Sequence, residues 1–164
     1  MEVKIIEAYS RQEMPAQITQ TTFIDFPKKQ DQWNFSWRSL SKVEGGEIYK
    51  LTLKAEKPEI EGLIMLTLMN DEMLYMNTIE VAPHNYGSNG RYENVAGCLI
   101  AFGCLKSFEL GKNNYEGYLT FESKTELIQF YQKKYGASIA AGKRMFINPK
   151  VGLNLIEKYL NRKL

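Results

Sequence analysis

The feature that most constrains the fold is a change in hydrophobic periodicity near residue 90. Upstream of it, three apolar segments separated by turn residues are typical of successive strands: Glu47–Leu53, Gly62–Leu68 and Met73–Val81. Downstream, apolar residues between about Tyr92 and Leu110 recur every three to five positions, as on one face of a helix. Successive strands followed by a helix predict an α/β domain whose sheet carries helices on its faces.

The rest of the chain fits this arrangement. The turn at Asn70-Asp71 predicts that Leu63–Leu68 and Leu74–Val81 pair as an antiparallel hairpin. The aromatic cluster Trp33–Trp37 is interpreted as an element laid over the sheet. The other expected elements are a strand at Val3–Ala8, a strand at Tyr118–Phe121, a helix from Ser123 or Thr125 to Gly136, a strand at Arg144–Ile147 and a helix from Asn148-Pro149. This order predicts a mixed, mostly antiparallel central sheet flanked by helices.

Length and composition limit the class of protein. With 164 residues, of which 44% are hydrophobic, the chain is expected to form a single globular domain over residues 1–164. The formal net charge of +2 and the scattered Lys and Arg residues argue against a nucleic-acid partner. No apolar run is long enough to cross a bilayer, and the amino terminus lacks the pattern of a secretory signal. We therefore expect no membrane partner and a cytoplasmic location.

Residues for metal or redox chemistry are few. Cys98 and Cys104 lie six positions apart in the expected helix, on different faces, and are interpreted as small buried thiols. His84 is the only histidine, and one histidine cannot assemble a zinc site without other ligands, so no metal is expected. The same residue has no evident nucleophile partner for a Ser-His-Asp or Cys-His site.

The junction between the third strand and the first long helix is the candidate ligand site. Pro83 ends the strand, and the polar stretch His84–Gly90 is expected to form a loop before the helix. Ligands of such sheets bind where the carboxyl end of a strand meets the amino end of a helix. The free amide groups and partial positive charge of a helix amino terminus favour a phosphate or pyrophosphate there.

The residues at this junction resemble a known signature. The segment Arg91-Tyr92-Glu93-Asn94-Val95-Ala96 looks like the Q/R-x-x-G-x-G/A signature of the GNAT superfamily of N-acetyltransferases. The resemblance implies a GNAT-like acyl-CoA N-acyltransferase fold with acetyl-CoA as the acyl donor. It further implies that pyrophosphate is held by the backbone amides of Arg91, Tyr92, Glu93, Asn94, Val95 and Ala96. Asn94 departs from the usual glycine, and a register that places Gly97 in the signature is the alternative.

A second stretch resembles the late helix of the same superfamily. Leu127 to Ala137 is similar to the pattern A-x-x-(L/F)-Y-x-x-x-G-F, with Tyr131 at its tyrosine. The resemblance implies that Tyr131 acts as general acid toward the leaving thiolate. It also implies that the pantetheine arm runs beside the backbone of Ile79, Glu80 and Val81. An amine would then attack the thioester directly, with orientation supplying much of the acceleration.

Three hypotheses follow. The first is an active N-acyltransferase that acylates an amine of a small molecule or a protein; its candidate bases, by position alone, are Glu80, Glu116 and Glu122. The second is a GNAT-like binding or regulatory module that has lost catalysis, in which Tyr131 is a core residue. The third is a nucleotide- or flavin-binding α/β protein, against which the run of strands before the first helix argues. A monomer or homodimer is expected.

Overall fold

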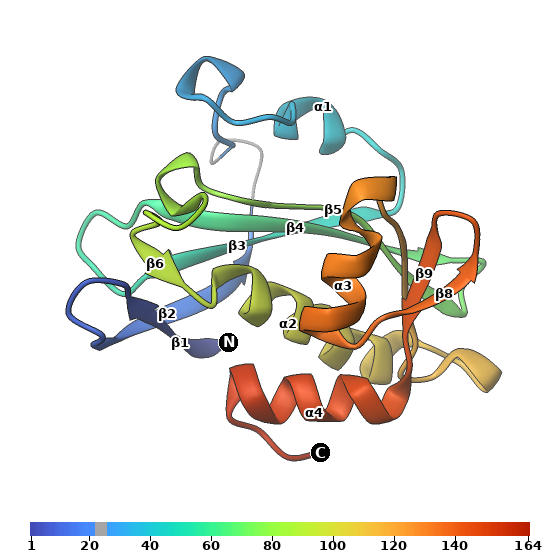
Figure 1. The fold of residues 1–164 in the computed structure, drawn as a ribbon. Helices are drawn as coiled ribbons and strands as arrows, with labels where there is room; N and C mark the ends of the chain where they lie inside the picture. The colour runs from blue at the N-terminus through green and yellow to red at the C-terminus, as the bar shows by residue number, and fades with distance from the viewer. Residues whose placement is uncertain (22–25) are drawn as a thin grey trace. The chain divides into compact units, whose positions relative to one another are not determined.

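The computed structural model describes residues 1–21 and 26–164 and has a mixed α/β architecture (Figure 1). The described residues form a nine-stranded sheet in the order β6-β1-β2-β3-β4-β5-β7-β9-β8. The strands are β1 (Glu2–Glu7), β2 (Glu13–Gln20), β3 (Gly46–Leu53), β4 (Ile60–Met69), β5 (Met73–Val81), β6 (Tyr92–Glu93), β7 (Leu119–Glu122), β8 (Ser138–Ala141) and β9 (Arg144–Ile147). The α-helices are α1 (Trp37–Leu40), α2 (Val95–Leu110), α3 (Ile128–Tyr135) and α4 (Pro149–Leu160).

The directions of the strands agree with the expectation from the sequence. The ladder between β5 and β7 is parallel, whereas β1–β2, β1–β6, β2–β3, β7–β9 and β8–β9 are antiparallel. The predicted fold class, a mixed and mostly antiparallel sheet flanked by helices, is therefore confirmed.

Two helix boundaries lie at capping residues identified in the sequence. α3 ends at Gly136, whose φ of 67° is in the left-handed region that glycine adopts easily. α4 begins after Asn148, whose Oδ1 accepts a hydrogen bond from Val151 N at 2.9 Å. The expected start of the α3 helix differs, because a 3-10 turn over Thr125–Leu127 (η5) precedes it.

Three strands were absent from the expectation: β2, β6 and β8. The first long helix was expected from about Tyr92, whereas Tyr92 and Glu93 form β6 by pairing with β1, and the helix begins at Val95.

β2 contains Pro15, which lies opposite Lys4 and whose carbonyl accepts a hydrogen bond from Lys54 N at 3.0 Å. Proline has a backbone carbonyl but no backbone N–H, so it can occupy a strand position at which no N–H has to donate a hydrogen bond to a neighbouring strand. Only Ala16 and Ile18 of β2 are buried, an alternation too short to indicate a strand. β8 is mostly exposed at the end of the strand order and has no apolar alternation at all.

By their internal contacts the described residues form two compact units. The first comprises Met1–Met65 and Thr78–Leu99, and the second comprises Leu66–Asn77 and Ile100–Leu164. The expectation of a single domain over residues 1–164 stays a prediction. None of the described helices combines the length and the apolar character that crossing a membrane requires.

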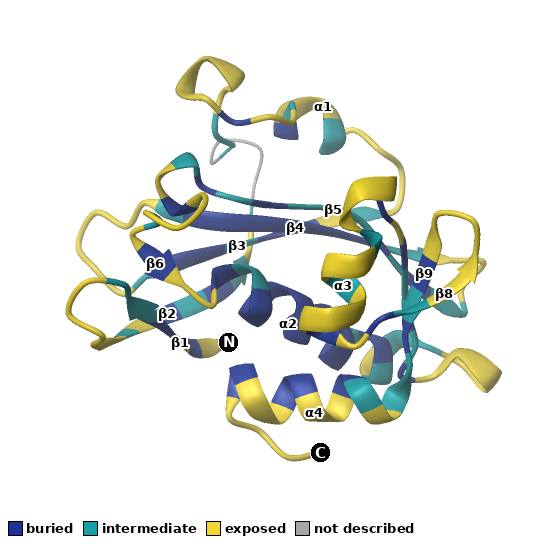
Figure 2. Ribbon diagram, in the orientation of Figure 1, coloured by how far each residue is buried: buried dark blue, intermediate teal, exposed yellow. Residues whose placement is uncertain are grey.

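In the first unit, β4 is buried on both faces (Figure 2). Gly62 faces the start of α2: a Cβ atom built there would lie 2.8 Å from Val95 Cγ1 and 2.9 Å from Leu99 Cδ1. Leu63 and Met65 point to the opposite face, where they join a buried cluster that contains both tryptophans of the chain. Burial on both faces explains why this strand reads as a continuous apolar run.

The aromatic segment of residues 33–37 is held in place by a buried carboxylate. Glu80 on β5 is 5% exposed. Four donors reach its two oxygens: Asn34 N at 2.5 Å, Phe35 N at 3.3 Å, Trp37 Nε1 at 2.8 Å and Tyr86 Oη at 2.9 Å. Burial and the adjacent Glu80 raise the pKa of Tyr86 to about 12, so this phenol stays a donor at neutral pH. The interpretation of the aromatic cluster as an element laid over the sheet is confirmed.

In the second unit, the β5–β7 ladder runs from Leu74↔Leu119 to Met76↔Phe121. These four side chains are buried. α4 packs against the later part of α2, and an ideal Cβ at Gly152 would lie 3.5 Å from Cys104 Cβ. The second unit therefore has a core of its own.

α2 differs from the amphipathic helix that its sequence suggests. Instead of one apolar stripe, nearly every residue from Val95 to Leu105 is buried (Figure 2). Spacing arguments consider only the large side chains, whereas Gly97, Ala101 and Gly103 allow close packing on the remaining faces. α2 is therefore a core helix.

Replacing Gly62 with alanine will destabilise the protein. The added methyl group would overlap Val95 and Leu99, and overpacking of this kind costs about 1–3 kcal/mol. Urea unfolding measures the loss. Gly152→Ala is the matched control, because its methyl group would make ordinary contacts and alanine is the better helix former. Equal unfolding midpoints for the wild type and Gly62→Ala would contradict the packing of α2 on β4.

Replacing Glu80 with glutamine will loosen the aromatic segment. The amide offers one accepting oxygen instead of two, so buried donors lose a charged partner, at a cost of about 1.5–3 kcal/mol. Trp33 and Trp37 are the only tryptophans, so their fluorescence during urea unfolding reports on this segment. Glu116→Gln, at an exposed carboxylate, is the control. An unshifted emission maximum together with an unchanged midpoint would show that Glu80 does not hold the segment.

Candidate functional site

The predicted strand-to-helix junction lies in the first unit. β5 ends at Val81, and the expected loop begins with a 3-10 turn over Pro83–Asn85 (η3). The chain then forms β6, which pairs antiparallel with β1 through Ile6↔Glu93 and Glu7↔Tyr92. α2 begins at Val95. Arg91–Ala96 therefore pass directly from a strand of the sheet into a helix.

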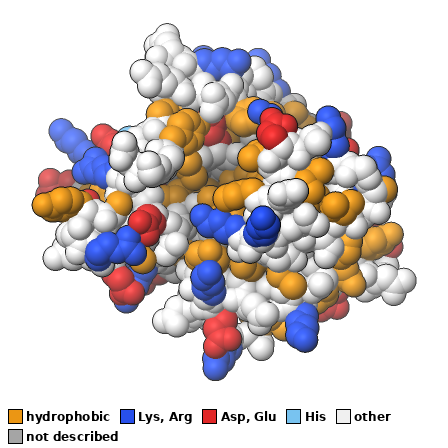
Figure 3. Space-filling view, in the orientation of Figure 1, with side chains coloured by type: hydrophobic (Ala, Val, Ile, Leu, Met, Phe, Trp, Pro, Cys, Tyr) orange, Lys and Arg blue, Asp and Glu red, His pale blue; other side chains and the backbone are white. Residues whose placement is uncertain are grey.

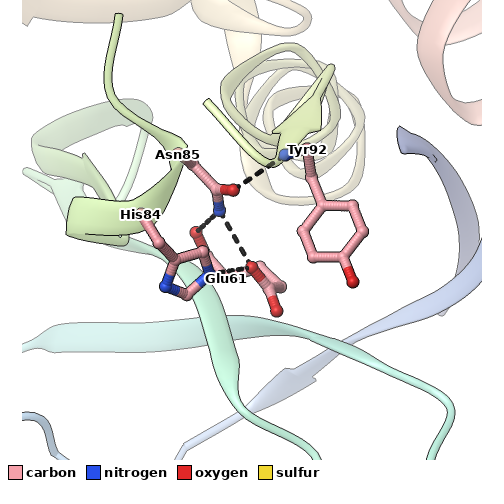
Figure 4. Close-up of polar contacts among 4 residues, drawn as sticks. All are labelled: Glu61, His84, Asn85 and Tyr92. Atoms are coloured by element: carbon pink, nitrogen blue, oxygen red, sulfur yellow. Dashed lines mark hydrogen bonds and ion pairs between the residues drawn. The ribbon is translucent and has the colours of Figure 1, made fainter. Parts of the chain in front are cut away.

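A network of buried polar groups holds the loop before this junction (Figure 4). Asn85 Oδ1 accepts a hydrogen bond from Tyr92 N at 3.0 Å, and Asn85 Nδ2 donates to Glu61 Oε2 at 2.9 Å. His84 Nε2 lies 2.6 Å from the same Glu61 oxygen. The network ties the loop to β4 and sets the path of the backbone two residues before Asn94.

Glu61 and Asn85 were not among the site residues predicted from the sequence. The available signal was an acidic residue at the start of the apolar run Ile60–Leu68, because a carboxylate buried in a strand requires hydrogen-bond partners. Its partners could not be identified, since they lie more than twenty residues away in the chain.

Asn94 occupies the conformation that a glycine would favour. Its φ is 69°, in the left-handed region, which asparagine enters more readily than most residues. Asn94 O accepts from Cys98 N at 2.9 Å, so this residue caps α2. In the described structure the amides of Val95, Ala96 and Gly97 have no hydrogen-bond acceptor, as expected for a first helical turn. The register with Asn94 at the glycine position therefore fits the backbone.

The side chains around this turn are compatible with an anion. The Arg91 side chain is exposed, and its guanidinium carbon lies 5.2 Å from the centre of the Tyr92 ring. Glu93, the acidic residue of the segment, forms an ion pair with Arg11 at 2.7 Å. The charge that would repel a phosphate is thus countered by a neighbouring cation.

The backbone of Ile79–Val81 belongs to the part of β5 that extends past its ladder with β7. That ladder ends at Met76↔Phe121, and Ala82 N, just after the strand, donates to Glu61 O on β4 at 2.8 Å. Ile79–Val81 and Arg91–Ala96 are both in the first unit.

The three carboxylates considered as bases differ in their surroundings. Glu80 is engaged by four donors, which gives it a structural task. Glu116 and Glu122 are exposed, and Glu122 Oε1 lies 3.8 Å from Arg144 Nε. The structure assigns no base.

Tyr131 lies in the second unit, on α3, within an aromatic cluster. Its ring centre lies 4.9 Å from that of Phe121, 5.7 Å from Phe130 and 6.1 Å from Tyr135. Burial raises the pKa of Tyr131, so the phenol keeps its proton at neutral pH. Its hydroxyl makes no hydrogen bond to any residue that the structure describes. The ring is packed like a core residue, while its proton is free to be donated.

Cys98 and Cys104 are buried thiols, as expected. Burial raises the pKa of Cys98 and of Cys104 to about 12, so neither thiol is a nucleophile at neutral pH.

The fold brings two carboxylates to His84, which the sequence showed without partner ligands. Glu59, Glu61 and His84 each have one potential ligand atom within 4.8 Å of the others. The 2.6 Å contact between His84 and Glu61 already joins two of these groups, so a cation would have to replace that bond.

Comparison with known proteins relates the chain to solved structures only. No protein-family model matches it, and no curated protein sequence matches it. A KacTA–DNA complex has a TM-score of 0.64 and 11% identity, over 87% of this chain and 99% of that chain. The spermidine/spermine N-acetyltransferase SpeG from Vibrio cholerae has a TM-score of 0.58 and 14% identity, over 85% and 98%. A GNAT family acetyltransferase from Elizabethkingia anophelis with acetyl-CoA bound has a TM-score of 0.54 and 19% identity, over 77% and 78%.

The expectation that excluded a nucleic-acid partner is wrong. It rested on a net charge of +2, yet a protein of this fold occurs in a complex with DNA. Net charge is a sum over the whole surface, and on the face shown in Figure 3 Lys and Arg side chains are interspersed with Asp and Glu. Contact with a polyanion depends on the local charge where the surfaces meet, which the sum does not describe.

The strand order, the strand-to-helix junction and the solved structures agree on the architecture. The chain has the fold of the GNAT acetyltransferases.

Proposed function

We propose that the protein is an N-acyltransferase that transfers the acetyl group of acetyl-CoA to an amine. The turn at Asn94 carries this proposal, because a left-handed residue there presents the unpaired amides of Val95, Ala96 and Gly97 at the start of a long helix. This turn is where the sequence resembles the GNAT signature. A protein of the same fold has acetyl-CoA bound, which supports this donor.

The Arg91–Ala96 segment would hold the diphosphate of the donor. Free amides and the partial positive charge of the α2 terminus attract the anion without a basic side chain. The exposed Arg91 adds a cation at the first position of the signature, and Arg11 offsets the charge of Glu93. The network of Glu61 and Asn85 would keep these groups in place before the ligand arrives.

The pantetheine arm would lie along Ile79–Val81. Backbone groups of a strand that extends past its neighbour can pair with an extended ligand as they would with another strand. The thioester, an activated acyl group, would thereby be oriented for attack, and orientation supplies a large part of the acceleration in such reactions.

The transfer balances with the groups that this chain supplies. The amine nitrogen forms a bond to the acyl carbon as the bond between that carbon and sulfur breaks. The nitrogen loses one proton to a base or to water, and the leaving thiolate takes one proton. Tyr131, which burial keeps protonated, is the proposed donor of that second proton and regains it from solvent.

The alternative is a GNAT-like binding or regulatory module without catalysis. Two observations favour it: Glu80 is committed to structure, and the ring of Tyr131 is packed among aromatic residues. The acceptor class, a small-molecule or protein amine, and the cytoplasmic location stay predictions.

Two substitutions at Asn94 test the diphosphate site. Aspartate and glycine both tolerate the left-handed backbone, so both variants should fold. Asn94→Asp adds a negative charge beside the proposed diphosphate and should weaken acetyl-CoA binding by about tenfold or more, whereas Asn94→Gly should bind equally well or more tightly. Calorimetry with acetyl-CoA measures both affinities. Equal affinities in all three proteins would place the diphosphate elsewhere. No binding to the wild type at high micromolar acetyl-CoA would rule out the acyltransferase.

Tyr131→Phe tests the general acid. The variant keeps the ring contacts and loses only the hydroxyl, so kcat should fall about 100-fold or more while KM for acetyl-CoA stays close to the wild-type value. Steady-state assays of thiol release with a panel of amines measure both constants. An unchanged kcat would assign Tyr131 to the core alone. Binding of acetyl-CoA to the wild type without turnover of any amine would favour the non-catalytic module.

A further inference from the structure

The second unit contains a cavity of about 700 Å³ that the proposed donor site does not use. All of its lining residues belong to this unit, and they come mainly from β5, β7, β9 and the segments next to these strands. A volume of this size is typical of sites for small molecules.

The strand register forms the floor of this cavity. Tyr75 pairs with Thr120, and Thr120 pairs with Phe146, so these three side chains form one row across β5, β7 and β9. Their neighbours Leu74 and Leu119 are buried on the opposite face of the strands. Thr120 has the smallest side chain of the row, so the cavity is deepest above Thr120, between the rings of Tyr75 and Phe146.

Aromatic and methionine side chains make up most of the cavity lining. The Tyr118 ring lies 6.0 Å from the Phe146 ring at an interplanar angle of 44°, and Tyr75 is on the other side of Thr120. Aromatic faces attract both apolar groups and cations. The cavity therefore suits a ligand that has an apolar body and a positive charge.

Among the described residues, the cavity has two charged lining residues, Glu122 and Arg144. The two residues are register partners, with Glu122 Oε1 3.8 Å from Arg144 Nε and side chains 58% and 76% exposed, respectively. An ion pair this long and this exposed contributes little, so Glu122 is free to exchange partners. Burial and, to a smaller extent, the Glu122 carboxylate raise the pKa of Tyr75, while Arg144 lowers it.

We propose that this cavity binds the acyl acceptor, and that the acceptor is a primary amine on an aromatic or aliphatic body, with its ammonium group beside Glu122. The assignment as acceptor rests on the proposed acyl transfer. β5 supplies Tyr75 to the cavity and, further along the same strand, Ile79–Val81 to the proposed pantetheine site. The aromatic rings and Thr120 bind the body of the amine, and Glu122 binds its ammonium group. The ammonium first loses one proton to water, and the neutral nitrogen then attacks the thioester.

The test measures binding of 2-phenylethylamine to the protein without acetyl-CoA, by ligand-observed NMR and calorimetry. 2-Phenylethanol, which has the same body without the charge, is the matched probe. Thr120→Trp places a large side chain in the floor of the cavity and should lower the affinity for both ligands by about tenfold or more. Glu122→Gln should lower the affinity for the amine severalfold and leave the affinity for the alcohol unchanged. Arg144→Gln removes the competing cation and should leave amine binding equal or tighter.

Acetyl-CoA titrations and turnover assays of the same proteins separate the two proposals. Acetyl-CoA affinity should be the same in the wild type and in Thr120→Trp, while KM for the amine rises in the variant. If the wild type binds acetyl-CoA but does not bind the amine at millimolar concentration, only the assignment of the cavity is overturned. The same holds if neither Thr120→Trp nor Glu122→Gln changes the affinity for the amine. A wild type that binds the amine in the cavity but never binds acetyl-CoA overturns the acyl transfer and the acceptor role together.

Discussion

The close approach of α2 to β4 at Gly62 is the constraint on which the first unit depends. A side chain at this position would collide with Val95 and Leu99. The start of α2 can therefore lie this close to β4 only because residue 62 is a glycine. That start places the left-handed Asn94 and the three free amides at the end of β6. The opposite face of β4 is covered by the aromatic segment of residues 33–37, so the strand is buried on both faces and has little freedom to shift. The proposed anion site is therefore built on a rigid element.

Two buried carboxylates organise the loops around that element. Glu61 fastens the segment from His84 to Tyr92, and Glu80 fastens residues 33–37. Each binds backbone or side-chain donors that would otherwise be left unpaired in the core, which is where a buried charge becomes stabilising. A carboxylate in a candidate site is commonly considered first as a base. Here the hydrogen-bond geometry gives both residues a structural task, and a base, if the reaction needs one, has to come from elsewhere or from water.

The sequence predicted those parts of the fold that local chemistry determines. Gly136 and Asn148 identified the ends of two helices, because a capping residue can be recognised from its own type and its neighbours. The apolar run Gly62–Leu68 identified a buried strand, because a strand covered on both faces is apolar at nearly every position. β2 was missed because a proline and only two buried residues concealed its alternation, and α2 was described too narrowly because its small residues were ignored. In the site, the resemblance to a signature singled out Arg91–Ala96, but the helix was expected from about Tyr92, so the strand β6 and the left-handed turn at Asn94 were not predicted. Glu61 and Asn85 could not be paired, since their contact depends on long-range packing. The net charge of +2 could not exclude a nucleic-acid partner, because a sum of charges over all residues does not say where on the surface they lie.

We propose that the amides of Val95, Ala96 and Gly97 bind the diphosphate of coenzyme A. Backbone amide NMR during titration tests it directly, with coenzyme A compared against pantetheine, which lacks the diphosphate. Coenzyme A should move the three amide resonances strongly, and pantetheine should leave them nearly unchanged. Coenzyme A binding that leaves these resonances in place while moving others would contradict it.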